Sequence, residues 1–125
     1  MMPFSKNLGL QLYVDDVAAE KAFFQSIGFT ILKETEMAGY PIVTMKTCNE
    51  SSVLFTIYAK EFIWQVSPAV IDMMPSILFE TENIEALQTT VYKAAPECSE
   101  IAFEPFPNFH FATPNGMHYA VKGIK

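Results

Sequence analysis

The sequence predicts an α+β fold in which one module occurs twice, and three observations support this prediction. Residues 8–29 read as a strand, a helix and the start of another strand. Residues 76–96 repeat this order, at an offset too long for a solenoid repeat. A polar turn and a final apolar strand then end each half, at 48–55 and at 114–121. Each half is therefore predicted to contain one strand, one helix and three further strands.

The first module begins with a strand over residues 8–14. Apolar side chains take every second position, so one face of this strand is predicted to be buried. Asp16 follows and can accept hydrogen bonds from the free N–H groups of a new helix. Apolar residues at helical spacing continue to Gly28, which can end that helix in a left-handed conformation. The two faces of the strand carry Leu8, Leu10, Leu12 and Val14 on one side and Gly9, Gln11 and Tyr13 on the other.

Three more strands complete the first half, and an apolar connector follows them. The strands are predicted over 29–37, 40–48 and 53–59, with a turn at 38–39 between the first two. The connector, 61–75, is rich in apolar residues, whereas an exposed linker would be polar. It is therefore predicted to pack over the sheet or to form a short helix in the core, or else to contribute part of the wall of a pocket or a dimer contact.

The second half repeats the plan of the first. Asn83 takes the place of Asp16 as the helix cap, and Pro96 marks the end of the helix. The proline-containing segment 104–107 interrupts two of the strands, and the residues 113–116 form a strong turn signal before the last one. We expect a strand at 76–81, a helix at 84–95 and strands at 100–103, 108–112 and 117–122.

Length and composition limit the possible classes of protein. The 125 residues are predicted to form a single domain, 1–125, with an internal repeat of 8–60 in 76–122. No apolar run reaches the length of a membrane span, and the first residues lack an apolar secretion signal. The net charge of −6 argues against nucleic acid or an anionic membrane as partner. Cys48 and Cys98 form no spaced motif and are expected to be reduced thiols in a cytoplasmic protein.

Two segments of the chain resemble the vicinal oxygen chelate superfamily, which contains glyoxalase I, the bleomycin-resistance proteins and the extradiol dioxygenases. The first is LYVDDVAAEKAFFQSIGF, residues 12–29, and the second is FHFATPNGMHYAV, residues 109–121. The second segment departs from the family pattern, because Thr113 replaces an Asp and Ala120 replaces a Glu. The resemblance implies that two βαβββ modules form a curved, mostly antiparallel mixed sheet, a cup with the helices on its convex side. It also implies a homodimer, as is usual in this family.

The resemblance further implies a position for a metal ion, which the family binds through four inward side chains. The corresponding positions here are Gly9, Leu54, Ser76 and Ala120. Three of these four residues carry no donor atom on the side chain, whereas the family uses His, Gln or Glu. We therefore expect no metal at the family position and no other cofactor.

The inward face of the predicted cup supplies the candidate ligand-binding residues. They combine aromatic and apolar area with a few polar groups, which suits a small molecule. Trp64 in the connector is a further candidate. The predicted ligand-binding set is Gln11, Tyr13, Leu54, Tyr58, Leu78, Glu80, His118 and Trp64.

Two hypotheses about function follow from this set. The first is a metal-independent small-molecule-binding protein of the bleomycin-resistance type, which sequesters a cationic or aromatic compound. The alternative is a lyase or dioxygenase of the same superfamily, with an unconventional metal site or with acid–base chemistry by His118 and Glu80. His110 is predicted to be a hydrogen-bonded structural residue, and a metal site formed by His110 and His118 lacks a matching carboxylate.

Overall fold

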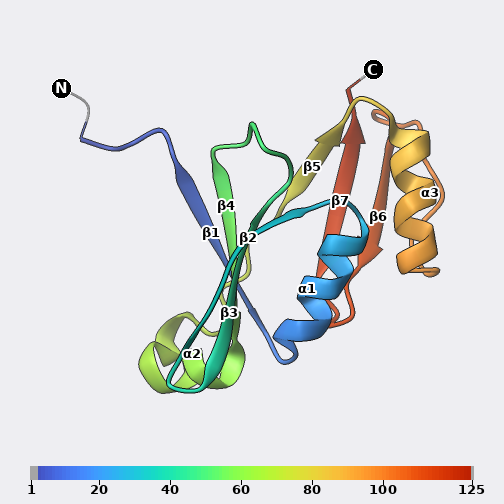
Figure 1. The fold of residues 1–125 in the computed structure, drawn as a ribbon. Helices are drawn as coiled ribbons and strands as arrows, with labels where there is room; N and C mark the ends of the chain where they lie inside the picture. The colour runs from blue at the N-terminus through green and yellow to red at the C-terminus, as the bar shows by residue number, and fades with distance from the viewer. Residues whose placement is uncertain (1–2, 125) are drawn as a thin grey trace. The chain divides into compact units, whose positions relative to one another are not determined.

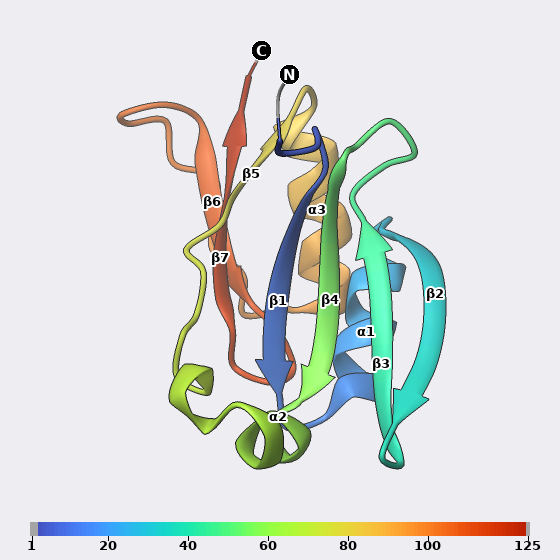
Figure 2. The ribbon, with the colours of Figure 1, turned by 90° about the vertical axis from the view of Figure 1, so that its left-hand side faces the viewer.

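The protein folds into two compact units, each with its own mixed sheet (Figures 1 and 2). The computed structural model describes residues 3–124, and the boundary between the units follows Pro75. None of the helices in the described part of the chain has the length and apolar character needed to cross a lipid bilayer.

The first unit contains a four-stranded sheet, three helical segments and one tight hairpin. The strand order is β1-β4-β3-β2, in which β1 runs parallel to β4 and the other pairs are antiparallel. Ala38 and Gly39 both have positive φ, 54° and 83°, and connect β2 to β3 in the predicted two-residue turn. The elements are β1 (Leu8–Val14), α1 (Val17–Ser26), β2 (Thr30–Met37), β3 (Tyr40–Lys46), β4 (Val53–Ala59), α2 (Lys60–Val66) and the 3₁₀ helix η1 (Pro68–Val70).

Helix α1 covers one face of this sheet and begins and ends where the sequence predicts. The side chain of Asp16 accepts a hydrogen bond of 3.0 Å from the backbone N–H of Ala19, and Gly28 adopts a φ of 110° after the helix. The helix packs on β3 and β4. Between them lies a core whose most deeply buried apolar members are Leu12, Val14, Phe24, Met45 and Ile57, and Glu20 of α1 is fully buried as well.

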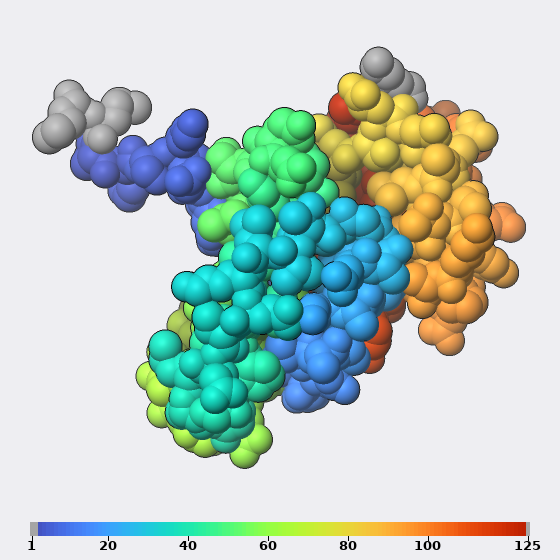
Figure 3. All heavy atoms as spheres, viewed as in Figure 1, coloured from blue at the N-terminus to red at the C-terminus, as the bar shows by residue number. Residues whose placement is uncertain are grey.

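The N-terminal half of β1 lies outside this core, so the prediction that the whole apolar face of the strand is buried is wrong for this half. Leu12 and Val14 are buried as expected, but Leu10 is half-buried and Leu8 is exposed. β1 is an edge strand with β4 on one side only, and α1 packs mainly on β3 and β4, so the start of β1 receives little cover from the helix. The opposite edge strand, β2, is also largely exposed, and its residues form part of the surface in Figure 3.

The second unit contains a three-stranded sheet covered on one face by a helix. The strand order is β5-β7-β6, with β5 parallel to β7 and β6 antiparallel to it. Asn83 caps the helix as predicted, through a 3.1 Å hydrogen bond from the N–H of Ala86. Val91, Phe109, Tyr119 and Val121 are buried here, whereas Phe79 is half-buried. The elements are β5 (Leu78–Thr81), α3 (Ile84–Ala94), β6 (Asn108–Ala112) and β7 (His118–Gly123).

The predicted strand at 100–103 does not form. Among the described residues, this segment makes one isolated bridge, between Ala102 and Asn108. Pro105 and Pro107 follow directly, and a proline has no N–H group to donate to a sheet ladder. The second unit therefore has three strands where four were expected, and residues 3–124 contain seven strands instead of eight.

Candidate functional site

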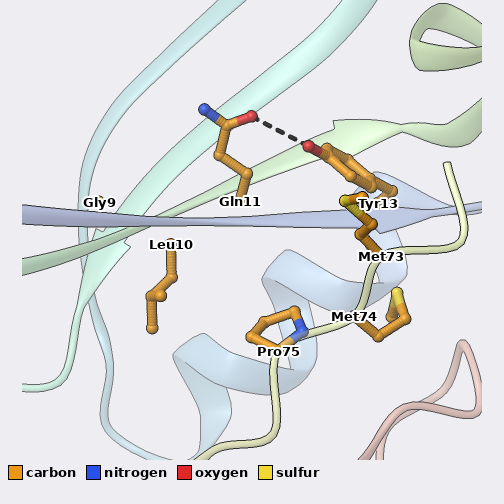
Figure 4. Close-up of a pocket in the computed structure, with 7 residues that line it drawn as sticks. All are labelled: Gly9, Leu10, Gln11, Tyr13, Met73, Met74 and Pro75. Carbon is orange, nitrogen blue, oxygen red and sulfur yellow. Dashed lines mark hydrogen bonds between the residues drawn. The ribbon is translucent and has the colours of Figure 1, made fainter. Parts of the chain in front are cut away.

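An open pocket with a volume of about 440 Å³ lies between β1 and the end of the connector in the first unit. Figure 4 shows that the side chains of Gln11 and Tyr13 project from one side of β1 and that of Leu10 from the other. Because the pocket touches residues on both sides of the strand, it follows the edge of β1 that β4 does not occupy. Its lining consists of Gly9, Leu10, Gln11, Tyr13, Met73, Met74 and Pro75.

Four of the predicted ligand-binding residues come together on one face of β1 and β4. The parallel register places Gly9 beside Leu54 and Tyr13 beside Tyr58. Side chains at paired positions project to the same side of a sheet, so this face carries Gln11, Tyr13, Leu54 and Tyr58 next to one another.

Tyr13 links the pocket to this face. Its hydroxyl group donates a 3.1 Å hydrogen bond to Oε1 of Gln11. Its ring lies 6.2 Å from the ring of Tyr58, with an angle of 50° between the two planes. The hydrogen bond and the ring contact hold a buried aromatic side chain in a defined orientation at the rim of the pocket.

Aromatic contacts continue from Tyr58 into the connector. The ring of Tyr58 stacks on that of Phe62 in α2 at 6.4 Å, and Phe62 contacts Tyr40 at 5.8 Å. The hydroxyl group of Tyr40 accepts a 3.0 Å hydrogen bond from the side-chain amide of Gln65. These contacts fix helix α2 against the sheet, which agrees with the prediction that the connector packs on the protein and is not an exposed linker. Trp64 lies on the same helix but is 63% exposed and does not line the pocket.

The end of the connector supplies pocket residues that the sequence analysis did not name. Met73, Met74 and Pro75 line the pocket together with the residues of β1 (Figure 4). Met73 is 64% exposed, so its side chain is accessible to a molecule in the pocket. The apolar composition of the connector indicated a wall, but no local pattern identified these three residues.

The remaining predicted residues lie in the second unit. Leu78 in β5 pairs with Ala120 in β7, and Glu80 pairs with Lys122. Leu78, Glu80 and His118 are all exposed. The pocket in the first unit, in contrast, contains no charged side chain, so its lining can offer apolar contact and neutral hydrogen bonds only.

The four family metal positions do not fit a metal ion. The register places Gly9 directly beside Leu54, and neither side chain has a donor atom. Ala120 has none, and Ser76 precedes β5 with a single hydroxyl group. Across residues 3–124, three or more His, Cys, Asp or Glu side chains do not gather anywhere in an arrangement that could hold a metal ion. We therefore derive no chemistry from a metal at the family position.

Comparison with solved structures identifies the fold. TnmS3, an antibiotic binding protein from Streptomyces sp. CB03234, matches with a TM-score of 0.78 over 98% of each chain. The chain has the fold of the glyoxalase and bleomycin-resistance proteins. A lactoylglutathione lyase from Agrobacterium tumefaciens matches at 0.70 over 98% of this chain and 96% of its own. A glyoxalase/bleomycin resistance protein from the same Streptomyces matches at 0.71 over 94% and 99%.

The sequence identities to these three structures are 16%, 16% and 14%, so the likeness concerns the fold. Neither a family model nor a curated protein sequence matches the chain. The glyoxalase and bleomycin-resistance fold includes binding proteins as well as enzymes. The function must therefore be argued from the residues of the site.

Proposed function

We propose that this chain is a metal-independent small-molecule-binding protein that sequesters an aromatic compound at the Gln11–Tyr13 face of its first unit. The observation that supports this most is the set of Gln11, Tyr13 and Tyr58, an oriented amide and two rings beside an uncharged pocket. Such a combination of apolar area with a few oriented polar groups is typical of small-molecule sites. The antibiotic-binding TnmS3 has the same fold, which agrees with this class of function.

The affinity of such a site comes mainly from apolar burial. An aromatic ligand would contact the accessible part of the Tyr13 ring and the thioether groups of Met73 and Met74, which adapt to flat surfaces. The amide of Gln11 would meet a polar edge of the ligand. Tyr13 is 7% exposed, so most of the newly buried apolar surface would come from Met73 and Met74, which are 64% and 43% exposed.

The uncharged lining favours an aromatic ligand over a cationic one. A cation gains from a nearby carboxylate, and the predicted carboxylate, Glu80, belongs to the second unit. Binding at the pocket requires no charge on the ligand. The absence of donor side chains at Gly9, Leu54 and Ala120 supports binding without a metal at the family position.

A thermal-shift screen tests this proposal. The screen compares uncharged polycyclic aromatic compounds with cationic compounds of the same ring size, in buffer with EDTA. A ligand that binds only the folded state raises the melting temperature, and the shift grows with the logarithm of its concentration relative to its Kd. We expect uncharged aromatic compounds to raise it, and we expect Tyr13→Ala to abolish the shift. A shift that Tyr13→Ala leaves unchanged, or one that EDTA removes, would contradict the proposal.

A homodimer is part of the same proposal. The end of the connector exposes the apolar side chains of Met73 and Met74, which a second copy of the chain could cover, and the family resemblance implies such a pair. Sedimentation velocity at micromolar concentration should give twice the chain mass of 14.1 kDa. A particle of one chain mass would show that the pocket acts within a monomer.

A further inference from the structure

The two histidines of the chain lie on the same face of the sheet β5-β7-β6. His110 is in β6 and His118 is in β7, and both are exposed. Their chain neighbours Phe111 and Tyr119 are buried, at 2% and 4% exposure. Because successive side chains of a strand point to opposite faces, the two imidazoles project from the face that α3 does not cover.

The register makes these histidines diagonal neighbours. His110 pairs with Ala120, and His118 pairs with Ala112. Diagonal neighbours on antiparallel strands are about 7–8 Å apart at the Cα atoms, and their side chains can meet. Each imidazole stands opposite an alanine, whose methyl group leaves room for the larger ring. The two rings can therefore turn toward each other over the alanines.

Hydrogen bonds fix the backbone of His110, and the nearby positive charge of Lys122 contacts an aromatic ring instead of the histidines. The N–H of His110 donates to Oγ of Ser99, and the N–H of Ser99 donates to the carbonyl oxygen of His110, both at 2.9 Å. Lys122 lies on the same face of β7, but its ammonium group sits 4.9 Å from the centre of the Phe106 ring. The ammonium group of Lys122 therefore binds at the end of the strand pair that is farther from His118.

We propose that His110 and His118, with no carboxylate ligand beside them among the described residues, chelate one divalent cation of the zinc, nickel or copper class. Imidazole nitrogen is a preferred ligand for these ions, whereas magnesium and calcium select oxygen. Water would complete the coordination, since both histidines are exposed. The site uses neither of the family positions in the second unit, Ala120 and Ser76, and it does not rest on the function proposed above.

Zinc titration followed by NMR of the imidazole carbon-bound protons tests this site. The untagged chain has two histidines and so gives two ring signals, each assigned from a single variant. We expect both signals to move along one isotherm with one zinc ion per chain. In His110→Ala the remaining ring should need at least about tenfold more zinc, because one ligand replaces a chelate. His118→Ala should behave likewise, and Glu80→Gln should match the parent.

Two results would overturn the proposal. One is a remaining ring that follows the parental isotherm in either single variant, which would mean that the imidazoles bind separately. The other is a parent in which only one ring responds, or in which magnesium produces the same movement as zinc. Amide spectra of both variants verify that they fold. If either variant does not fold, the titration of the parent alone tests the proposal, because two separate sites would give two isotherms or more than one zinc ion per chain.

Discussion

The two modules use the same backbone arrangement to present different chemistry. In the first, β1 runs parallel to β4 and places Gln11 and Tyr13 beside Thr56 and Tyr58. In the second, β5 runs parallel to β7 in the same way and places Leu78 and Glu80 beside Ala120 and Lys122. These two sets of side chains cannot serve the same ligand chemistry.

The difference shows which part of a duplicated module is free to change. Both modules keep the helix cap, the parallel strand pair and an aromatic core, because these features stabilise the fold. The face away from the helix carries no such requirement. An amide and two tyrosines occupy it in the first module, and a carboxylate, a lysine and two histidines in the second.

The largest expected effect tests the shared aromatic cores. Phe24 and Phe109 are each 1% exposed, and truncating a buried Phe to Ala costs roughly 3–5 kcal/mol. Urea unfolding of Phe24→Ala and Phe109→Ala should show losses of this size in both. Phe4→Ala and Phe103→Ala are matched controls at exposed positions, where the change should stay within about 0.5 kcal/mol. A core variant as stable as its control would show that the corresponding module does not depend on its aromatic core.

The two thiols provide the second contrast. Cys48 in the first unit is exposed, whereas Cys98 in the second is 8% exposed. Burial raises the pKa of the Cys98 thiol, although a hydrogen bond from Gln88 opposes this shift. At neutral pH, Cys98 therefore has less of the reactive thiolate and less access to reagent. With a disulfide reagent we expect the exposed thiol of Cys48 to react at least about a hundredfold faster than that of Cys98. Cys48→Ser should remove the fast phase, and its persistence would contradict the placement of Cys98.

The helix caps should show a smaller and nearly equal effect. Asp16→Ala and Asn83→Ala each remove one hydrogen bond to a helix N-terminus, which costs about 1 kcal/mol. Asp16 also places a negative charge at the positive end of α1, so its loss should be the larger of the two at low salt. Asp15→Ala changes a neighbouring carboxylate and leaves the capping hydrogen bond in place. If it costs as much as Asp16→Ala in urea unfolding, the cap is assigned to the wrong residue.

The smallest effects concern the open faces. Tyr13→Phe removes the hydrogen bond to Gln11, which contributes at most about 1 kcal/mol because it is partly solvated. Glu80→Gln removes an exposed charge beside Lys122 and should change the free energy of unfolding by less than about 0.5 kcal/mol. High salt should abolish any effect of Glu80→Gln and leave that of Tyr13→Phe unchanged. The opposite salt dependence would contradict the claim that the face in the first module is uncharged and the face in the second is charged.

Local patterns were sufficient to predict most of the fold. The alternation in residues 8–14 gave the strand β1, and Asp16 and Asn83 gave the starts of both helices, because capping depends on neighbouring residues alone. The strand expected at 100–103 was wrong, since the prolines that follow prevent further pairing. The burial of Leu10 depends on the sheet edge, which only the strand order defines.

The candidate site was predictable only where it follows from strand register. Alternation placed Gln11 and Tyr13 on one face, and the structure puts Leu54 and Tyr58 beside them. The part played by Met73 and Met74 depends on how the connector returns toward β1, and no spacing in the sequence encodes that path. The sequence alone does not determine on which face of the sheet the side chain of His110 lies. The register of β6 with β7 places it on the same face as His118.

Calorimetric titration of an uncharged aromatic ligand, in the presence of EDTA, tests the central claim most directly. We compare the parent with Tyr13→Ala in the first module and Glu80→Gln at the corresponding position of the second. Loss of the Tyr13 ring should weaken binding by at least about tenfold, because it removes part of the pocket wall and the group that orients Gln11. Glu80→Gln should bind as the parent does. Equal binding by Tyr13→Ala and the parent, or a loss confined to Glu80→Gln, would contradict a ligand site on the uncharged face of the first module.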